Sequence, residues 1–122
     1  MGYFPLYSTR GDLAGYLINA YIYDRQGEWI GWLDRDSCVF SVSGEYVGWL
    51  SKDFRILRKS NVDESPPRHR PPARPPLHVL VPPSAPLPPL MAELGYDVLD
   101  VFDETPARLH VIDADPAARD ID

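Results

Sequence analysis

The chain has few of the features that usually stabilise a small domain or make it catalytic, such as cysteine pairs, metal ligands and catalytic motifs. Its 122 residues include a single cysteine, Cys38, so no internal disulfide can form. The three histidines are scattered without the spacing of metal ligands, so neither a metal nor another cofactor is expected. The sequence also has no glycine-rich phosphate loop and no Ser/His/Asp pattern. These absences predict a protein that is not an enzyme.

Long apolar runs and an excess of positive charge are absent too. No apolar run reaches the length of about eighteen residues that a membrane span requires. The first residues lack the basic flank and apolar core of a secretion signal, so a cytoplasmic protein is expected. The net charge is −6, and residues 91–122 hold nine acids against two arginines, which disfavours nucleic-acid binding.

What the chain does contain is a segment repeated three times, over residues 6–17, 22–33 and 39–50. Each copy opens with an aliphatic residue and an aromatic, and each closes with an aromatic and a leucine. Between them lie a polar stretch that ends in a glycine followed by an acid, and then a second glycine. Strand-favouring residues on both sides of such a stretch predict one β-hairpin per copy. The repeat glycines are Gly11, Gly15, Gly27, Gly31, Gly44 and Gly48.

The second glycine of each copy falls inside a predicted strand. Alternation over residues 29–33 predicts Trp29, Gly31 and Leu33 on one face of the strand, with Ile30 and Trp32 on the other. A glycine at such a place indicates close approach of another group or a bend in the strand. Since the glycine recurs in register, we expect one repeated cause: an aromatic ring from the adjacent hairpin, or simple strand curvature.

The predicted fold is mainly β: three tandem hairpins in an antiparallel meander, then a proline-rich arm and a short α/β segment. The corresponding units are residues 1–60, 61–89 and 90–122. Residues 54–58 are predicted to add a strand. An incomplete fourth copy begins there, with Ile56 and Leu57 in register and Asn61 in the turn-glycine position, and after Asn61 the pattern stops.

The apolar pattern at the start of the acidic last unit fits a helix in part and a strand in part. We expect a short helix from about Leu90 that ends at Gly95, followed by a hairpin of residues 96–102 and 108–113. Residues 114–122 are expected to be frayed.

The arm holds eleven of the fourteen prolines between Pro66 and Pro89, which predicts an extended polyproline II segment. Its PxxP spacings would suit a ligand for a proline-reading protein partner, but any segment so rich in proline contains such spacings by chance, so the alternative is preferred. In this alternative, the arm is a stiff spacer or lies over exposed tryptophans.

Aromatic residues are abundant, with three Trp, seven Tyr and four Phe, most of them in the first fifty residues. A repeated part of this size has too small a core to cover them, so self-association into a symmetric homo-oligomer is expected. The alternative is a small-ligand module in which aromatic slots bind a sugar or an amine. The slot residues would be Trp29, Trp32, Trp49, Tyr16 and Tyr46.

Three acids, Asp12, Glu28 and Glu45, follow the turn glycines at equivalent positions. Arrayed around an axis, they would ring a cation or a sugar. The alternative, a solvated residue just after a turn, needs no ligand.

Two stretches, Tyr23 to Leu33 and Gly44 to Leu50, resemble the 4-fold β-flower proteins, a family of small bacterial proteins. The resemblance covers roughly residues 3–60 and implies a β-rich unit with fourfold symmetry. Because one chain shows three full copies, we expect four chains, a homotetramer. The resemblance brings no catalytic residue. The stretch Ile22 to Gly31 is similar to the opening hairpin of PRC-barrel domains, which implies a protein-binding adaptor.

Overall fold

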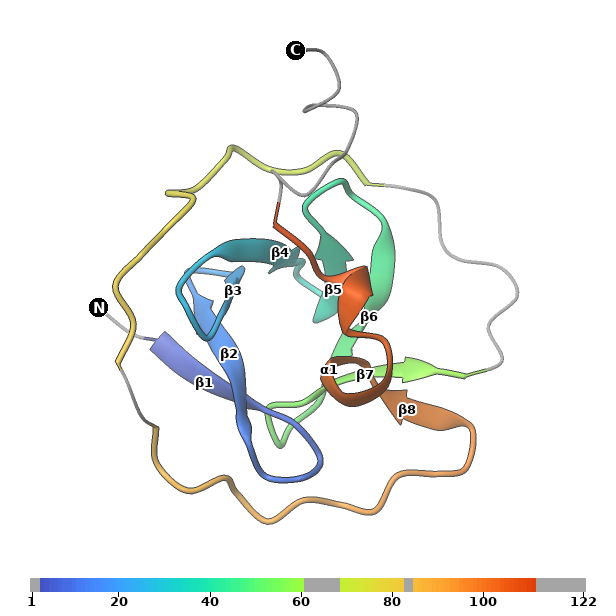
Figure 1. The fold of residues 1–122 in the computed structure, drawn as a ribbon. Helices are drawn as coiled ribbons and strands as arrows, with labels where there is room; N and C mark the ends of the chain where they lie inside the picture. The colour runs from blue at the N-terminus through green and yellow to red at the C-terminus, as the bar shows by residue number, and fades with distance from the viewer. Residues whose placement is uncertain (1–2, 61–68, 83–84, 112–122) are drawn as a thin grey trace.

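The computed structural model of the chain describes residues 3–60, 69–82 and 85–111 and is dominated by one antiparallel sheet (Figure 1). Its eight strands are hydrogen-bonded in sequence order, which confirms the predicted meander. The strands are β1 (Tyr3–Tyr7), β2 (Leu13–Ile18), β3 (Tyr21–Asp24), β4 (Trp29–Leu33), β5 (Cys38–Ser41), β6 (Tyr46–Leu50), β7 (Ile56–Lys59) and β8 (Val98–Asp100). A short helix, α1 (Val101–Glu104), and a 3₁₀ turn (Pro106–Arg108) follow.

The sheet curls into a half-barrel whose inner face holds the main core. The first residue of every copy lies there, at most 1% exposed: Leu6, Ile22, Val39 and Ile56. In Figure 1, α1 lies in front of β7, at one side of the half-barrel, and its Val101 joins the core. The fourth copy therefore begins at Ile56, as predicted. The pairing of β7 with β8 adds a fourth pair of strands within one chain, so the fold does not need four chains to supply four pairs.

A β-bulge in each hairpin decides which side chains enter the core. In β3–β4, Ile22 pairs with Gly31 and Tyr23 pairs with Trp29, so Ile30 is an extra residue. Ile30 turns into the inner core, while Trp29 and Trp32 pack together in a second, outer cluster. The predicted alternation over residues 29–33 is wrong here, because one inserted residue reverses the faces on either side of it.

Each second glycine admits a carbonyl group of the next strand. A Cβ at Gly15, Gly31 or Gly48 would collide with the carbonyl oxygen of Tyr23, Phe40 or Leu57, respectively. The three carbonyl groups occupy equivalent positions, because Tyr23, Phe40 and Leu57 are each the second residue of the following copy. As expected, the same cause requires a glycine at all three positions. It is a backbone group, and not the aromatic ring that the sequence suggested.

The last strand departs from the prediction. Residues 90–94 form no helix, and β8 pairs with β7 instead of with residues 108–113. At Asp100 the chain turns into α1, because the Asp100 carboxylate accepts the Phe102 N–H at 3.0 Å and caps the helix. Asn61, residues 112–113 of the expected hairpin and residues 114–122 lie outside the described part of the chain.

Hydrogen bonds close the gap between the first and the last strands. The backbone N–H of Tyr7 donates to the Phe54 carbonyl at 2.9 Å. Both the N–H and the hydroxyl of Thr9 donate to one carboxylate oxygen of Asp100, each at 2.6 Å. The turn after β1 is thereby fixed to the turn before β7 and to the end of β8.

Candidate functional site

The outer face of the sheet carries a row of buried rings. Tyr7, Tyr16, Tyr23, Trp29, Trp32 and Phe40 all lie there with little exposure. The arm is the predicted unit of residues 61–89, and its described parts, residues 69–82 and 85–89, run outside the sheet and follow its perimeter (Figure 1). The rings are thus covered by a segment of the same chain.

Four tyrosine hydroxyls fix the arm to this face. Each donates to a backbone carbonyl of the arm: Tyr21 to Ala73 at 2.6 Å, Tyr23 to Pro76 at 3.1 Å, Tyr16 to Pro82 at 2.9 Å and Tyr7 to Pro86 at 2.7 Å. Carbonyls of a proline-rich chain suit this role, because such a chain has few N–H groups and makes no internal hydrogen bonds.

The arm also makes a strand-like contact at the turn of the second hairpin. The Trp29 N–H donates to the Leu77 carbonyl, and the Val79 N–H donates to the Gly27 carbonyl, both at 2.9 Å. Gly27 has φ of +87°, and a Cβ there would collide with the Val79 carbonyl oxygen. Gly27 therefore serves the turn and the docking of the arm at once.

The arm meets the hairpins one after another, in reverse order. Its His69 N–H donates to the carbonyl of Gly44 at 2.9 Å, its Val79 reaches Gly27, and its Pro88 lies beside Gly11. Two of the tyrosine contacts are equivalent as well, since Tyr23 and Tyr7 occupy the same repeat position and bind carbonyls ten residues apart. One hairpin thus corresponds to about ten residues of the arm, or ~30 Å of polyproline II helix.

Contacts within the central part of the arm recur every third residue. Residues 73, 76 and 82 accept from tyrosines, and residue 79 donates to Gly27. Polyproline II has three residues per turn, so this spacing places the contacts on one side of such a helix. At the start of the described arm, the His69 ring stacks on Phe40 with centroids 4.4 Å apart.

Burial disfavours ionisation of three of the tyrosine hydroxyls that bind the arm. Desolvation raises the pKa of Tyr7, and it raises the pKa of Tyr16 and Tyr23 as well, with smaller contributions from neighbouring phenols. A phenol donates a hydrogen bond only while it is protonated. The contacts to the arm are therefore maintained at neutral pH.

The profile of the 4-fold beta flower protein family matches residues 4–94, about three quarters of the chain. The chain belongs to this family. The matched range runs past the repeated strands and through the arm, so both parts fall within the β-flower unit. Comparisons with curated proteins and with solved structures gave no match.

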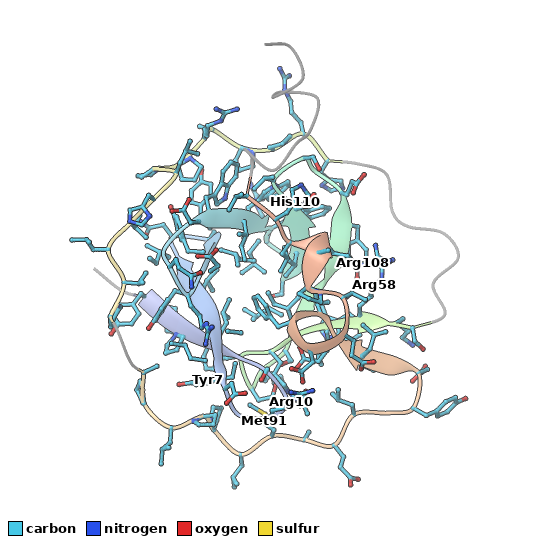
Figure 2. The ribbon with its side chains drawn as sticks, viewed as in Figure 1. Tyr7, Arg10, Arg58, Met91, Arg108 and His110 are labelled. Carbon is cyan, nitrogen blue, oxygen red and sulfur yellow. The ribbon has the colours of Figure 1, made fainter. Side chains whose placement is uncertain are left out.

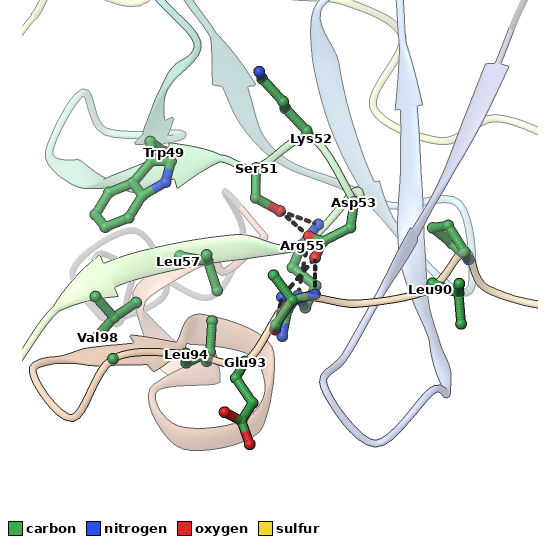
Figure 3. A pocket seen from close by; sticks show the side chains of 13 residues that line it. Trp49, Ser51, Lys52, Asp53, Arg55, Leu57, Leu90, Glu93, Leu94 and Val98 are labelled. Carbon is green, nitrogen blue, oxygen red and sulfur yellow. Dashed lines mark hydrogen bonds and ion pairs between the residues drawn. The ribbon is translucent and has the colours of Figure 1, made fainter.

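The residues predicted as aromatic slots divide into two groups in this β-flower protein. Tyr16, Trp29 and Trp32 are buried, and the Trp29 indole N–H donates to the Gly31 carbonyl at 2.7 Å. Tyr46 and Trp49 are half-buried. Trp49 lines an open cavity of about 490 Å³ together with Leu57, Leu94 and Val98 (Figure 3).

The same cavity borders a buried ion pair that the sequence analysis missed. The guanidinium of Arg55, which is 1% exposed, donates to both carboxylate oxygens of Asp53, at 3.0 and 2.6 Å (Figure 3). Arg55 also donates to the Thr9 hydroxyl at 3.2 Å and to the Ala92 carbonyl at 2.8 Å. The pair therefore joins two turns of the sheet to the chain that follows the arm. An Asp-x-Arg sequence in a turn is too common to signal such a contact.

The three repeated acids do not form a metal site. Asp12, Glu28 and Glu45 belong to three separate turns, and in the described residues no cluster of three or more His, Cys, Asp or Glu side chains suits a metal ion. One oxygen of Glu28 lies 2.8 Å from Nδ1 of His78 in the arm. Within the same described ranges, no helix is long and apolar enough to cross a membrane.

Proposed function

We propose that this protein is a non-enzymatic interaction module whose outer face binds an extended proline-rich chain, and that its own arm is the resident ligand. The observation that carries the proposal is the set of tyrosine hydroxyls that donate to arm carbonyls. Aromatic grooves that read proline-rich ligands work by the same chemistry, since a preformed polyproline II helix loses little entropy on binding. This mode agrees in kind with the protein-binding adaptor that the weaker sequence resemblance implied.

Amide hydrogen exchange of the full chain tests the docking of the arm. The double variant Tyr7→Phe and Tyr23→Phe removes two hydroxyls and keeps the rings. Because each lost hydrogen bond contributes about 0.5–1.5 kcal/mol, exchange at the Val79 amide should accelerate about tenfold. Tyr96→Phe is the matched control, since the Tyr96 side chain is fully exposed. Equal exchange rates in all three proteins would contradict the docking mode.

Binding in trans tests the interaction role itself. A labelled peptide with the sequence of residues 71–82 is titrated into the full chain and into a chain that carries Pro76→Gly and Pro82→Gly. In the intact chain the peptide must compete with a tethered arm at an effective concentration of about a millimolar. Glycine weakens the polyproline II preference of that arm, so the substituted chain should bind the peptide more tightly. No binding to either chain would refute the proposal.

Self-association belongs to the same proposal. The homotetramer was inferred from the presence of only three full copies and from rings that one chain would leave uncovered. Within one chain, β7 and β8 form a fourth strand pair and the arm covers many of the rings. What still favours a homo-oligomer is an exposed apolar rim that includes Tyr3, Phe4, Leu80, Leu87 and Leu90. Sedimentation equilibrium gives the subunit number, and a chain that is monomeric at high concentration would remove this part of the proposal.

A small-ligand role is the second candidate, because Trp49 and several aliphatic side chains line an open cavity together with the charged residues Lys52 and Glu93. An aromatic and apolar wall with a few charged groups suits a sugar or an amine. Quenching of tryptophan fluorescence by such compounds, lost in Trp49→Leu and kept in Trp29→Phe, would support this role. A cytoplasmic location remains a proposal alongside both functions.

A further inference from the structure

One stretch of the arm differs from all the rest of it. Residues 77–81, with the sequence Leu-His-Val-Leu-Val, form the longest proline-free window between Pro66 and Pro89. Two prolines precede the window and two follow it. The window is rich in strand-favouring residues and contains no lysine or arginine, which are the usual protectors of an exposed strand edge.

Only one edge of this window is hydrogen-bonded. The Leu77 carbonyl and the Val79 N–H face the second hairpin and bond to Trp29 and Gly27. In an extended chain, alternate residues direct their backbone groups to opposite edges. His78 forms the bridge to Glu28, so its own N–H and C=O groups face away from the sheet, and within the described residues no hydrogen bond reaches these groups or those of Leu80.

The side chains at this edge are exposed as well. Leu80 is 95% exposed, although Val79 beside it packs against the outer aromatic cluster. An almost wholly apolar cavity of about 560 Å³ adjoins the window and is lined by Tyr3, Ile18 and residues 79–82. The arm forms the outermost part of the molecule in this region (Figure 2), so nothing in the described chain stands between this edge and a second molecule.

We propose that residues 77–81 pair with the same residues of a second copy of this chain and so form a two-fold symmetric dimer by β-augmentation. The window is self-complementary. In an antiparallel pair centred on Val79, His78 of each copy lies opposite Leu80 of the other, and the free groups of both residues meet as a hydrogen-bonded pair.

The flanking prolines define the length of this contact. Pro76 and Pro82 have no N–H to donate, so the ladder ends at the borders of the window and does not extend into fibre-like pairing. The pairing would also bring Leu77 of the second copy opposite Val81, at the edge of the apolar cavity. It would cover Leu80 without displacing the arm from its own sheet.

Sedimentation velocity of the full chain, from micromolar to near-millimolar concentration, tests the dimer. Leu80→Pro removes the Leu80 N–H, which makes no hydrogen bond within the described chain, and leaves a residue type that the arm already tolerates. It should raise the dimer dissociation constant about tenfold or more, because each dimer loses two hydrogen bonds. Arg74→Pro is the matched control, since Arg74 is also exposed on the arm but lies outside the window; it should leave the constant unchanged.

Amide exchange supplies an independent measurement. Protection of the His78 and Leu80 amides should rise with protein concentration, whereas protection of the Val79 amide should not change. A chain that is monomeric throughout, or an assembly that Leu80→Pro leaves intact, would overturn the proposal. Neither result bears on the docking of the arm, which the Tyr→Phe exchange experiment tests in a monomer.

Discussion

The ion pair between Asp53 and Arg55 offers the sharpest test of what closes the sheet. In Asp53→Asn the side chain keeps its size, but the Arg55 guanidinium loses its charged partner. The side chain of Arg55 is 2% exposed, and in the described residues no other carboxylate lies within ion-pair distance of it. The remaining acceptors of Arg55, the Thr9 hydroxyl and the Ala92 carbonyl, are neutral.

The expected loss of stability is large. Removing one partner of a buried ion pair costs about 3–5 kcal/mol, because the other charge stays buried without compensation. The Ser51 hydroxyl also donates to the Asp53 carboxylate, and the Ala92 N–H donates to it at 3.2 Å, so an amide in its place satisfies fewer donors. We therefore expect Asp53→Asn to lower the free energy of unfolding by about 3 kcal/mol.

Urea unfolding followed by tryptophan fluorescence measures this change. Asp97→Asn is the control, because Asp97 pairs with Lys59 at 3.7 Å near the surface, where such pairs contribute about 0–1 kcal/mol. The double variant Asp53→Asn with Arg55→Met should recover part of the loss, since it leaves no buried charge. If Asp53→Asn costs no more than Asp97→Asn, the ion pair does not close the sheet and the reasoning fails.

The pH dependence of stability provides a second measurement on the same pair. Desolvation by burial is the largest single influence on the Asp53 carboxyl and raises its pKa. The hydrogen bonds from Arg55, Ser51 and Ala92, together with the charge of Arg55, outweigh it and leave the pKa below the ordinary 3.8. The unfolded chain then binds the proton more readily, so this stabilisation is present above pH 3.8 and is lost as the pH falls through the lower folded value. The difference between wild type and Asp53→Asn should shrink in that range.

Three further predictions concern the repeats and the tyrosines. Gly31→Val should destabilise the fold by well over ~1 kcal/mol in thermal unfolding, because its side chain meets the Phe40 carbonyl, whereas Gly95→Ala, which meets only the end of a flexible side chain, should be mild. Gly27→Ala should accelerate amide exchange at Val79 more than at Tyr23, since it combines a strained φ with a collision against the arm; equal effects would contradict the contact. Stability should fall as the pH rises from 10 through the raised folded pKa of Tyr7 and Tyr23, and the double Tyr→Phe variant should flatten this fall.

Local patterns in the sequence were sufficient to predict the hairpins. The polar stretches that end in Gly11, Gly27 and Gly44 placed three turns correctly, and each of these glycines has a positive φ. Ile56 was recognised as the start of a fourth copy because it keeps the spacing of the other three. These features depend on neighbours close in the chain, which is why a single sequence reveals them.

The errors arose where distant segments decide the structure. β8 exists because Val98 to Asp100 pair with β7 about forty residues earlier, and no local pattern announces that partner. Trp29 and Trp32 share the outer cluster because of a bulge, which strict alternation cannot include. The docking of the arm had a signal that was overlooked. Pro76 and Pro86 are ten residues apart, and their tyrosine partners sit at one repeat position.

The length of the arm argues that it is more than a connection. The Ser60 N–H donates to the Asp97 carbonyl at 2.7 Å, so the two ends of the loop between β7 and β8 meet. A turn of about four residues would join such strands, yet 36 residues intervene. Closing the longer loop costs about 2 kcal/mol more in chain entropy, and ordering its residues costs further. Sheet topology does not require this cost. The tyrosine contacts offset part of it. Under the proposed function, the remaining cost is explained by the need to hold a proline-rich chain on the outer face, where a partner competes for it.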